Sequence, residues 1–371
     1  MQPLNRRLSR TLQLGLKRPQ QKSYPHINGL YLLLRATGLG RFDPTAASPR
    51  LQLDTNLLVS WAGLSPTEQY LTLLETWLLR GRLEIIGEDR GSFWSTMPLT
   101  GWASLYNKIP AVGLVIGPEN KRVEESLRYQ PGLTNLALLE LFGLVRIKDG
   151  PPLPGAGWHI QQIERTLTGE AWLACLLQLM TDQFDELAAY DDPSEIRFGI
   201  WQPALRPWFP NWRRTLTFPE PEFQEGLFIL KVSLGREEMW RRLAVPAQLS
   251  LDELAGAILT AINFDFDHLY RFTYANRFGA IKTVECPDIS EYPEEPLTTS
   301  VRLGDLPLQV GQTMTFTYDF CDWWKFEIRL EEIRPADPRP RQVELLARHG
   351  ASPRQYDWYT DDDDFEEAGS G

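Results

Sequence analysis

The last third of the sequence holds the pattern that most constrains its fold: two alternating segments followed by a capped helix. Apolar and polar residues alternate from 228 to 234, and Met239 to Val245 returns as a second such segment after a turn. Side chains of a strand point alternately to its two faces, so both segments predict strands. Ser250 and Glu253 have the spacing of a capping box, and apolar residues up to Ile262 follow helical spacing. Two strands followed by a helix that can cover them predict an α+β unit.

Further strand patterns follow this helix. They lie around His268 to Tyr274, at Thr313 to Phe320, and from Phe326 to Leu330. We therefore predict an α+β fold in which a mixed sheet packs on one helix, preceded by a mainly helical, winged-helix-like region. The expected organisation is a basic lead-in at 1–50, a helical, winged-helix-like region at 51–200, a linker rich in proline and tryptophan at 201–225, the α+β domain at 226–335, and a C-terminal helix with an acidic tail at 336–371.

Short motifs in the α+β region are similar to those of one known family. They are Met239–Arg242 with Val245–Pro246, the capped helix, Asn263–Phe272, Leu303–Leu306 and Tyr318–Trp324. On these motifs, residues 227–333 resemble the plasmid pRiA4b ORF-3-like domain family, which is associated with mobile elements and has no assigned biochemical role. The segment Arg348 to Tyr356 also resembles members of this family.

Two positions depart from the family pattern. Cys321 stands where the resemblance implies glycine, which indicates that this turn does not need a positive φ angle. Phe326 stands where the resemblance implies histidine, which removes a potential ligand or proton carrier.

In the N-terminal half, the first well-marked element is a helix that begins after Ser65. Pro66 at the first helical position and Glu68 complete a capping box, and Gly81 predicts the end of the helix. Leu83 to Ile86 is then predicted to be a short strand.

A second unit spans about 131 to 190. It reads as a helix at Leu136 to Phe142, a strand at Leu144 to Ile147, a Pro/Gly loop, a returning strand at 158–166, and a helix at Ala171 to Met180 that begins at Thr168. This order, with the phrases Leu141–Val145 and Thr166–Glu170, resembles the end of a winged-helix domain.

The segment 201–225 contains five prolines and three tryptophans, Trp201, Trp208 and Trp212, without any period. We interpret it as an ordered linker whose aromatic rings lie on neighbouring surfaces.

Charge is distributed unevenly along the chain. The total is -11, yet residues 1–50 carry nine basic residues against one acidic residue, so the remainder carries -19. The segment Asp357–Glu367 alone holds seven acidic residues and no basic one. An acidic surface repels phosphate, so any nucleic-acid contact is expected through the basic N-terminal arm.

The cysteine and hydropathy patterns indicate in which cellular compartment the protein is expected. Cys175, Cys286 and Cys321 are odd in number and far apart, which favours reduced thiols, and the absence of a CxxC pair argues against a cysteine-based zinc site. The longest strongly apolar stretch, Ala171 to Met180, is too short to span a bilayer. We expect a cytoplasmic protein without membrane contact.

One cluster of residues has the composition of a chemical site: Asp265, Asp267, His268, Asp319 and Asp322. Carboxylates with an imidazole could bind magnesium or manganese, or Asp267, His268, Asp319 and Asp322 could supply an acid/base pair. The alternative is structural. Asp265 and Asp267 would then cap a turn, Asp319 and Asp322 would bracket a hairpin, and His268 would be a partly buried strand histidine. We favour the structural alternative and assign no metal or cofactor.

Aromatic and basic residues form a second set, the candidate ligand- or partner-binding residues Trp240, Arg241, Arg242, Trp323 and Trp324. The tryptophans could form a platform for a base or a peptide, and the arginines a phosphate clamp. The alternatives are a sheet core for the aromatic rings and a charge-protected edge strand for the arginines.

No nucleophile elbow, P-loop or strand-anchored G-x-G-x-x-G is present. The first functional hypothesis is therefore a non-enzymatic binding or adaptor protein with a protein partner. The alternatives are a mobile-element-associated nucleic-acid-binding protein and a metal-dependent hydrolase or nuclease.

Overall fold

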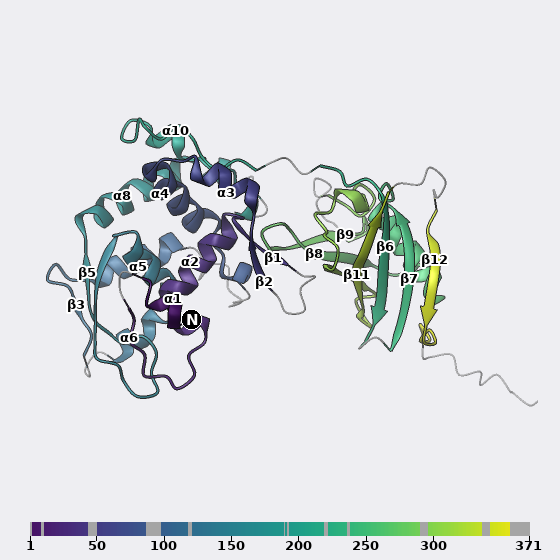
Figure 1. The fold of residues 1–371 in the computed structure, drawn as a ribbon, viewed down its shortest axis with the longest axis horizontal. Coiled ribbons are helices and arrows are strands. Elements are labelled where there is room, and N and C mark those ends of the chain that lie inside the picture. Colours follow the sequence, from purple (N-terminus) through teal and green to yellow (C-terminus); the bar gives the residue numbers. More distant parts are fainter. Residues whose placement is uncertain are drawn as a thin grey trace, which may run out of the picture. The chain divides into compact units, whose positions relative to one another are not determined.

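Two separate hydrophobic cores divide the chain into an N-terminal and a C-terminal unit (Figure 1). The structure is a computed structural model, and it describes residues 2–8, 11–43, 50–86, 98–117, 121–188, 190, 193–218, 222–235, 238–289, 296–335 and 342–356. The N-terminal unit comprises residues 1–42, 51–219 and 278–280, and the C-terminal unit comprises the rest. Each unit is described by itself.

The N-terminal unit is mainly helical. Its helices are α1 (Gln2–Asn5), α2 (Pro25–Ala36), α3 (Thr55–Ala62), α4 (Pro66–Glu75), α5 (Pro98–Lys108), α6 (Lys121–Leu127), α7 (Leu133–Leu141), α8 (Leu167–Asp182), α9 (Phe184–Ala188) and α10 (Gln202–Leu205). Short helical turns are η1 (Gln21–Ser23), η2 (Thr76–Arg80), η3 (Leu83–Ile86) and η6 (Pro193–Glu195). Strands β1 (Gly40–Asp43) and β2 (Arg50–Leu53) form a two-stranded sheet, and β3 (Leu114–Val115), β4 (Val145–Asp149) and β5 (Ile160–Arg165) form a three-stranded sheet in the order β3-β5-β4.

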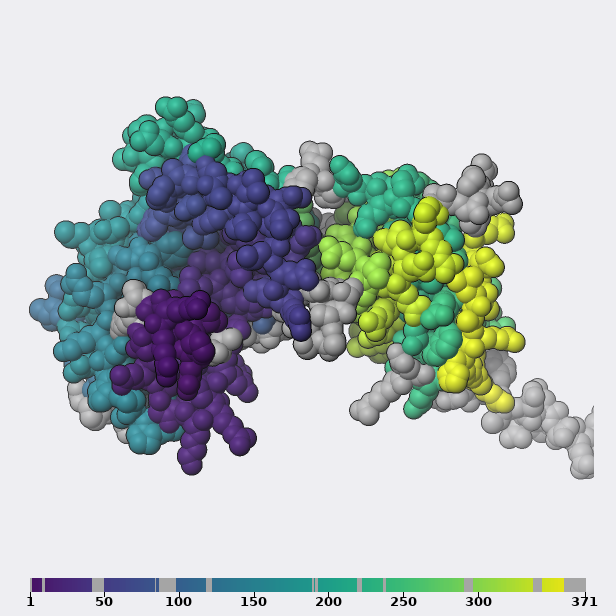
Figure 2. Space-filling view, in the orientation of Figure 1, coloured from purple at the N-terminus to yellow at the C-terminus, as the bar shows by residue number. Residues whose placement is uncertain are grey.

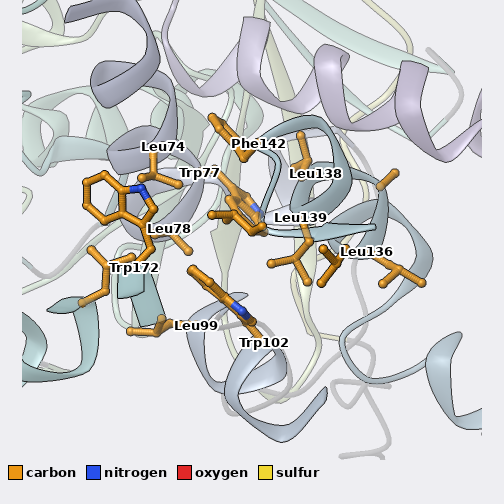
Figure 3. Close-up of a cluster of buried hydrophobic side chains, with 14 of the residues drawn as sticks. Leu74, Trp77, Leu78, Leu99, Trp102, Leu136, Leu138, Leu139, Phe142 and Trp172 are labelled. Atoms are coloured by element: carbon orange, nitrogen blue, oxygen red, sulfur yellow. The ribbon is translucent and has the colours of Figure 1, made fainter. Parts of the chain in front are cut away.

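Helix α4 begins as predicted. The Ser65 hydroxyl accepts the Glu68 N–H and the Glu68 carboxylate accepts the Ser65 N–H, which completes the capping box. The helix continues as the π-helical turn η2, where Trp77 is fully buried and stacks on Phe142 at 5.4 Å between ring centroids. In Figure 3, side chains from η2, α5, α7 and α8 meet in this core. The predicted strand at Leu83–Ile86 is wrong, because these residues form the 3-10 turn η3.

The lead-in at 1–50 is not a free arm. Its largest element is α2, which lies against α7: the ring nitrogen Nε2 of His26 is 2.8 Å from Glu140, and the Asn28 amide donates to the Thr134 hydroxyl at 3.1 Å. Gly29 faces Leu138 so closely that a Cβ at this position would lie 2.8 Å from Leu138 Cγ. The helix was missed because buried polar residues and a glycine interrupt the apolar pattern of its buried face.

The interpretation of 201–225 as a segment whose aromatic rings lie on neighbouring surfaces agrees with the burial of two of its three tryptophans. Trp201 and Trp212 are buried in the N-terminal core, and only Trp208 is exposed, at 66%. The predicted start of the helix at Thr168 is two residues late, because Thr166 is the N-cap of α8 and accepts the Gly169 N–H.

The C-terminal unit is an antiparallel sheet with one helix on it, as Figure 1 shows. Its elements are β6 (Leu227–Leu234), β7 (Met239–Pro246), α11 (Leu251–Ile262), β8 (Tyr270–Ala275), β9 (Ile281–Glu285), η7 (Leu303–Asp305), β10 (Thr313–Tyr318), β11 (Trp324–Arg334) and β12 (Glu344–His349). The strand order is β12-β7-β6-β11-β10-β8-β9. The α+β fold with one helix on the sheet is confirmed, although the described pairings are all antiparallel and not mixed.

Alternation along the strands builds the core of this unit. Phe228, Leu230 and Val232 of β6 are buried in the same core as Leu254 and Ile258 of α11. The capping box between Ser250 and Glu253 is present, and Asn263 ends the helix in the left-handed conformation.

The predicted C-terminal helix is wrong where the structure describes it, because residues 344–349 form strand β12. This strand pairs with β7 at the edge of the sheet and is yellow in Figures 1 and 2. The edge of β7 offers unpaired backbone groups, and pairing with them outweighs the helical appearance of the segment. The acidic run at 361–364 lies outside the described residues.

Candidate functional site

Most of the predicted site residues meet at one end of the C-terminal sheet. At this end β6 turns into β7, β10 turns into β11, β8 begins and β12 finishes. The register makes this explicit, since Tyr318 pairs with both Tyr270 and Trp324, and Trp240 pairs with His349. Antiparallel pairing therefore collects segments that are distant in the sequence, and we call this region the signature end.

The carboxylate of Asp267 is the centre of a hydrogen-bond network. Tyr356 donates to its Oδ2 at 2.6 Å, and Gln355 donates to its Oδ1 at 3.2 Å. The Tyr318 hydroxyl lies 3.0 Å from Oδ1 and 2.6 Å from the Asp265 carbonyl, and it accepts the N–H groups of Asp267 and His268 at 3.2 Å each. Both oxygens of Asp267 are thus occupied by protein donors.

His268 lies beside this network, in the segment just before β8 and not in the strand. Its Nε2 is 3.4 Å from the Tyr356 oxygen and 3.7 Å from a carboxylate oxygen of both Asp267 and Asp319. The Tyr356 proton is committed to Asp267 at the shorter distance of 2.6 Å. A hydrogen bond between His268 and Tyr356 therefore requires the tautomer that carries the proton on Nε2.

Hydrogen bonding and burial shift the acidities within the network. The bond from Tyr356 lowers the pKa of Asp267 below its usual range, helped by Tyr318 and His268 and opposed by burial. The same bond raises the pKa of Tyr356, and burial with the Asp267 carboxylate raises the pKa of Tyr318 to about 12. Asp267 is therefore an anion held by two neutral phenols near neutral pH.

The other acidic candidates serve the turns. Asp319 has a φ of 53° and a buried side chain, and its Oδ1 accepts the Cys321 N–H at 2.9 Å. Asp322 is exposed on the same turn and does not join the network. Asp265 is also exposed, and its backbone N–H and carbonyl contact Gln355. The turn does use positive φ angles, at Asp319 and Trp323, but Cys321 is not among the positive-φ residues, so the inference from its departure from glycine holds for that position alone.

No group of three or more His, Cys, Asp or Glu side chains among the described residues is arranged to hold a metal ion. For the cluster around His268 this follows from the network, because its carboxylates point at hydroxyl, amide and backbone donors.

A cavity of about 560 Å³ opens next to the network. Its wall includes Asp252, Phe266, Asp267, His268, Cys286 and Asp288. The Tyr270 hydroxyl, also in the wall, donates to Asp252 and lies 3.1 Å from the Thr298 hydroxyl. Burial and the Asp252 contact raise the pKa of Tyr270, so this phenol stays neutral.

Arg241 is a structural residue. It is 4% exposed, and its guanidinium donates to the carbonyls of Ala261 and His349 and to the Ser352 hydroxyl at 2.8 to 2.9 Å. It therefore holds the segment after β12 against the end of α11 and does not form a phosphate clamp. Arg242 points to the opposite face, where it pairs with Glu331 at 2.7 Å.

The tryptophans divide between two places. Trp240 stacks on His349 at 5.8 Å, with Lys231 and Arg242 near its ring. Trp323 is 47% exposed and lies beside Phe320. Trp324 packs edge-on against Phe264 at 5.2 Å. Trp323 precedes it in the turn with a φ of 53°, so the alternation expected of an extended backbone does not apply to this pair.

Sequence reasoning missed three residues that complete the site: Gln355, Tyr356 and Asp252. Gln355 and Tyr356 lie 88 or more residues from their partners near Asp267, so no local pattern joins them. The similarity of the segment 348–356 to the family was the available signal.

Comparison with known proteins places this region in context. Residues 227–355 match the family model described as plasmid pRiA4b ORF-3-like protein. The match confirms the predicted resemblance at 227–333 and extends to Gln355, so the pRiA4b ORF-3-like domain includes most of the segment that closes the network.

A solved structure is also similar, the crystal structure of a protein of unknown function from Methanosarcina mazei Go1. It has 25% sequence identity and a TM-score of 0.31, over 35% of this chain and 72% of that one. No curated protein matches the chain. Among the described residues, no helix has the length and apolar character needed to cross a membrane.

Proposed function

We propose that this is a non-enzymatic binding protein whose recognition centre is the cavity at the signature end of the pRiA4b ORF-3-like domain. The observation that carries the proposal is a cavity of about 560 Å³ beside Asp267 and His268, two side chains that already contact the Tyr356 hydroxyl. A cavity with fixed polar groups and an aromatic wall is the usual form of a binding site.

The same geometry disfavours the hydrolase alternative. A general base must accept a proton from the reacting group, but both Asp267 oxygens already accept bonds from Tyr356, Gln355 and Tyr318. Asp319 is engaged by its own turn, and Asp322 lies apart from the network.

Site-specific photo-crosslinking in the source cells tests the proposal. Leu269 lines the cavity and Val310 does not, yet both side chains are 40% exposed, so they form a matched pair. With benzoylphenylalanine in place of Leu269, we expect a discrete crosslinked protein that is absent with the same replacement at Val310. Equal crosslinking at the two positions, or none at either, would remove the cavity as the recognition centre.

We also propose that residues 98–182 form a winged-helix unit. The supporting observation is the element order α5, β3, α6, α7, β4, β5, α8 with the sheet order β3-β5-β4, in which the first strand pairs with the last. In DNA-binding helix-turn-helix proteins, the second helix of the motif enters the major groove. Here that helix is α7, and residues 134–139 are buried while α2 contacts it through His26, Asn28 and Gly29.

Nucleic-acid binding is accordingly a second candidate that would use basic side chains and not α7. Several basic residues of the first 50 remain exposed: Arg6, Arg7, Lys17, Arg18 and Lys22. The N-terminal segment that carries them contacts the loop between β4 and β5. Gly15 donates its N–H to the Ala156 carbonyl, and the Gly15 carbonyl accepts the N–H of Gly155.

A further inference from the structure

Trp208 is displayed on the surface of the N-terminal unit, in the loop that follows α10. Its side chain is 66% exposed, whereas Trp201 and Trp212 on either side of it in the sequence are buried. In Figure 2 the teal atoms around α10 form a protrusion at the top of this unit. One exposed apolar side chain is ordinary on a protein surface, so the meaning of Trp208 depends on its surroundings.

The backbone that carries Trp208 is held in place. The Leu205 carbonyl accepts the N–H groups of Trp208 at 3.1 Å and Phe209 at 2.9 Å, and the Phe209 carbonyl accepts the N–H of Trp212 at 2.9 Å. The Phe209 ring stacks on Trp172 of α8 at 5.5 Å between ring centroids. We call residues 206–213 the Trp208 loop. Because this loop is already ordered, a ligand that binds the indole incurs little entropy cost for fixing it.

The charge of this region is opposite to that of the whole chain. Residues 196–218 carry four arginines and no acidic residue, although the chain as a whole has a net charge of -11. Two of the four form ion pairs: Arg197 with Glu186 at 2.9 Å and Arg214 with Glu68 at 3.5 Å. The other two, Arg206 and Arg213, are exposed and form no ion pair with any residue that the structure describes. The two arginines without ion pairs therefore stand on either side of Trp208 in the sequence.

From the displayed indole, its ordered loop and these two arginines together, we infer that the Trp208 loop binds an acidic segment of a partner protein. Apolar side chains of the segment pack on the indole, and its carboxylates pair with Arg206 and Arg213. Tryptophan and arginine are the residue types that contribute most to binding at protein interfaces. This site belongs to the N-terminal unit and does not depend on the proposed function of the cavity.

The same observations disfavour the other large anionic partners. Stable contact with an anionic membrane requires a cluster of about four to eight basic residues or two separate anchors, and the Trp208 loop offers one indole and two arginines without ion pairs. A membrane or a nucleic acid also presents an extended negative surface to the whole acidic molecule, whereas a short segment meets only the loop.

The test begins with random peptides displayed on phage and selected on the immobilised full-length protein. We expect a consensus in which aspartate or glutamate alternates with apolar residues. The affinity of the consensus peptide, labelled with fluorescein and measured by fluorescence anisotropy, should fall at least about 30-fold in Trp208→Ala. Arg206→Gln combined with Arg213→Gln should weaken binding about two- to tenfold and make it less sensitive to salt.

Matched controls lie in the C-terminal unit. Trp323→Ala removes another exposed indole, which is 47% exposed, and Arg329→Gln combined with Arg348→Gln removes two exposed arginines. Both controls should bind the consensus peptide as the wild type does.

Three results would overturn the inference. The first is selection without an acidic consensus, and the second is a consensus peptide that binds Trp208→Ala as tightly as the wild type. The third comes from sedimentation with vesicles of equal parts phosphatidylserine and phosphatidylcholine, where we expect no binding. Vesicle binding by the wild type that is lost in Trp208→Ala would assign the loop to a membrane surface and not to a protein.

Discussion

At the scale of single residues, the most informative buried group is Glu75 at the end of α4. Its side chain is 1% exposed, and its carboxylate accepts the N–H groups of Gly199 and Trp201, which ties the segment after η6 to the N-terminal core. Burial raises the pKa of Glu75 from 4.5 to about 7. The bonds from the two backbone N–H groups, together with the positive charges of Arg80 and Arg197, lower the pKa and offset the effect of burial only in part.

The raised pKa predicts a specific pH dependence of stability. Between pH 4.5 and about 7 the folded protein retains a proton that the unfolded chain has lost, so the contribution of Glu75 to stability falls as pH rises through this window. Glu75→Gln cannot ionise. The difference in free energy of unfolding between wild type and variant should therefore shift against the wild type by up to about 3 kcal/mol from pH 4.5 to 7. Urea denaturation at several pH values measures it, and a constant difference would contradict the prediction.

At the scale of elements, local signals were predictable and long-range ones were not. Both capping boxes are present because Ser65 with Glu68, and Ser250 with Glu253, need only three residues of separation. Strand alternation was also readable in the sequences of β6, β10 and β11, although only β11 shows a period of two in its burial, since both faces of β6 are largely buried. By contrast, β12 depends on the free edge of β7.

The candidate site divides in the same way. Asp267, His268 and Asp319 were predictable as a group because they lie in the family-like motifs 263–272 and 318–324, and the structure brings them together. The hydrogen bonding of these side chains was not predictable, because it depends on Tyr356, which is far away in the sequence. The exposed acid Asp322 shows the limit of composition as a guide, since it shares the turn but not the network.

The neighbours Arg241 and Arg242 of β7 offer a matched test of how β12 is held. Arg241→Met removes the donors for the backbone after β12 and leaves buried carbonyls unpaired, so we expect a loss of about 2 to 4 kcal/mol in the free energy of unfolding. Amide hydrogen exchange of residues 344–349 should accelerate. Arg242→Met, on the opposite face with a surface ion pair, should cost less than about 1 kcal/mol. Equal exchange in both variants would show that strand pairing alone holds β12.

At the scale of the whole molecule, the net negative charge disfavours binding of nucleic acid by the basic N-terminal segment. The first 50 residues carry nine basic residues against one acid, but part of this charge serves the fold. Arg35 is 4% exposed and donates to the Phe278 carbonyl, and Arg41 pairs with Asp54 at 3.1 Å. The total of -11 repels phosphate from the rest of the surface, so any binding must come from the exposed basic side chains of the first segment.

A gel shift with salt titration tests this reasoning. We expect binding only at low salt, with an affinity that falls steeply as salt rises, because each phosphate contact releases counterions. Lys17→Gln combined with Arg18→Gln should weaken binding to any sequence alike and reduce the slope of log affinity against log salt by about 2. The control combines Lys325→Gln with Arg329→Gln, which removes two exposed charges from β11 and should leave the slope unchanged. Binding that resists salt, or a slope lowered equally by both pairs, would exclude the basic segment as the contact. Nucleic acid would then no longer compete with a protein partner as the ligand of this molecule.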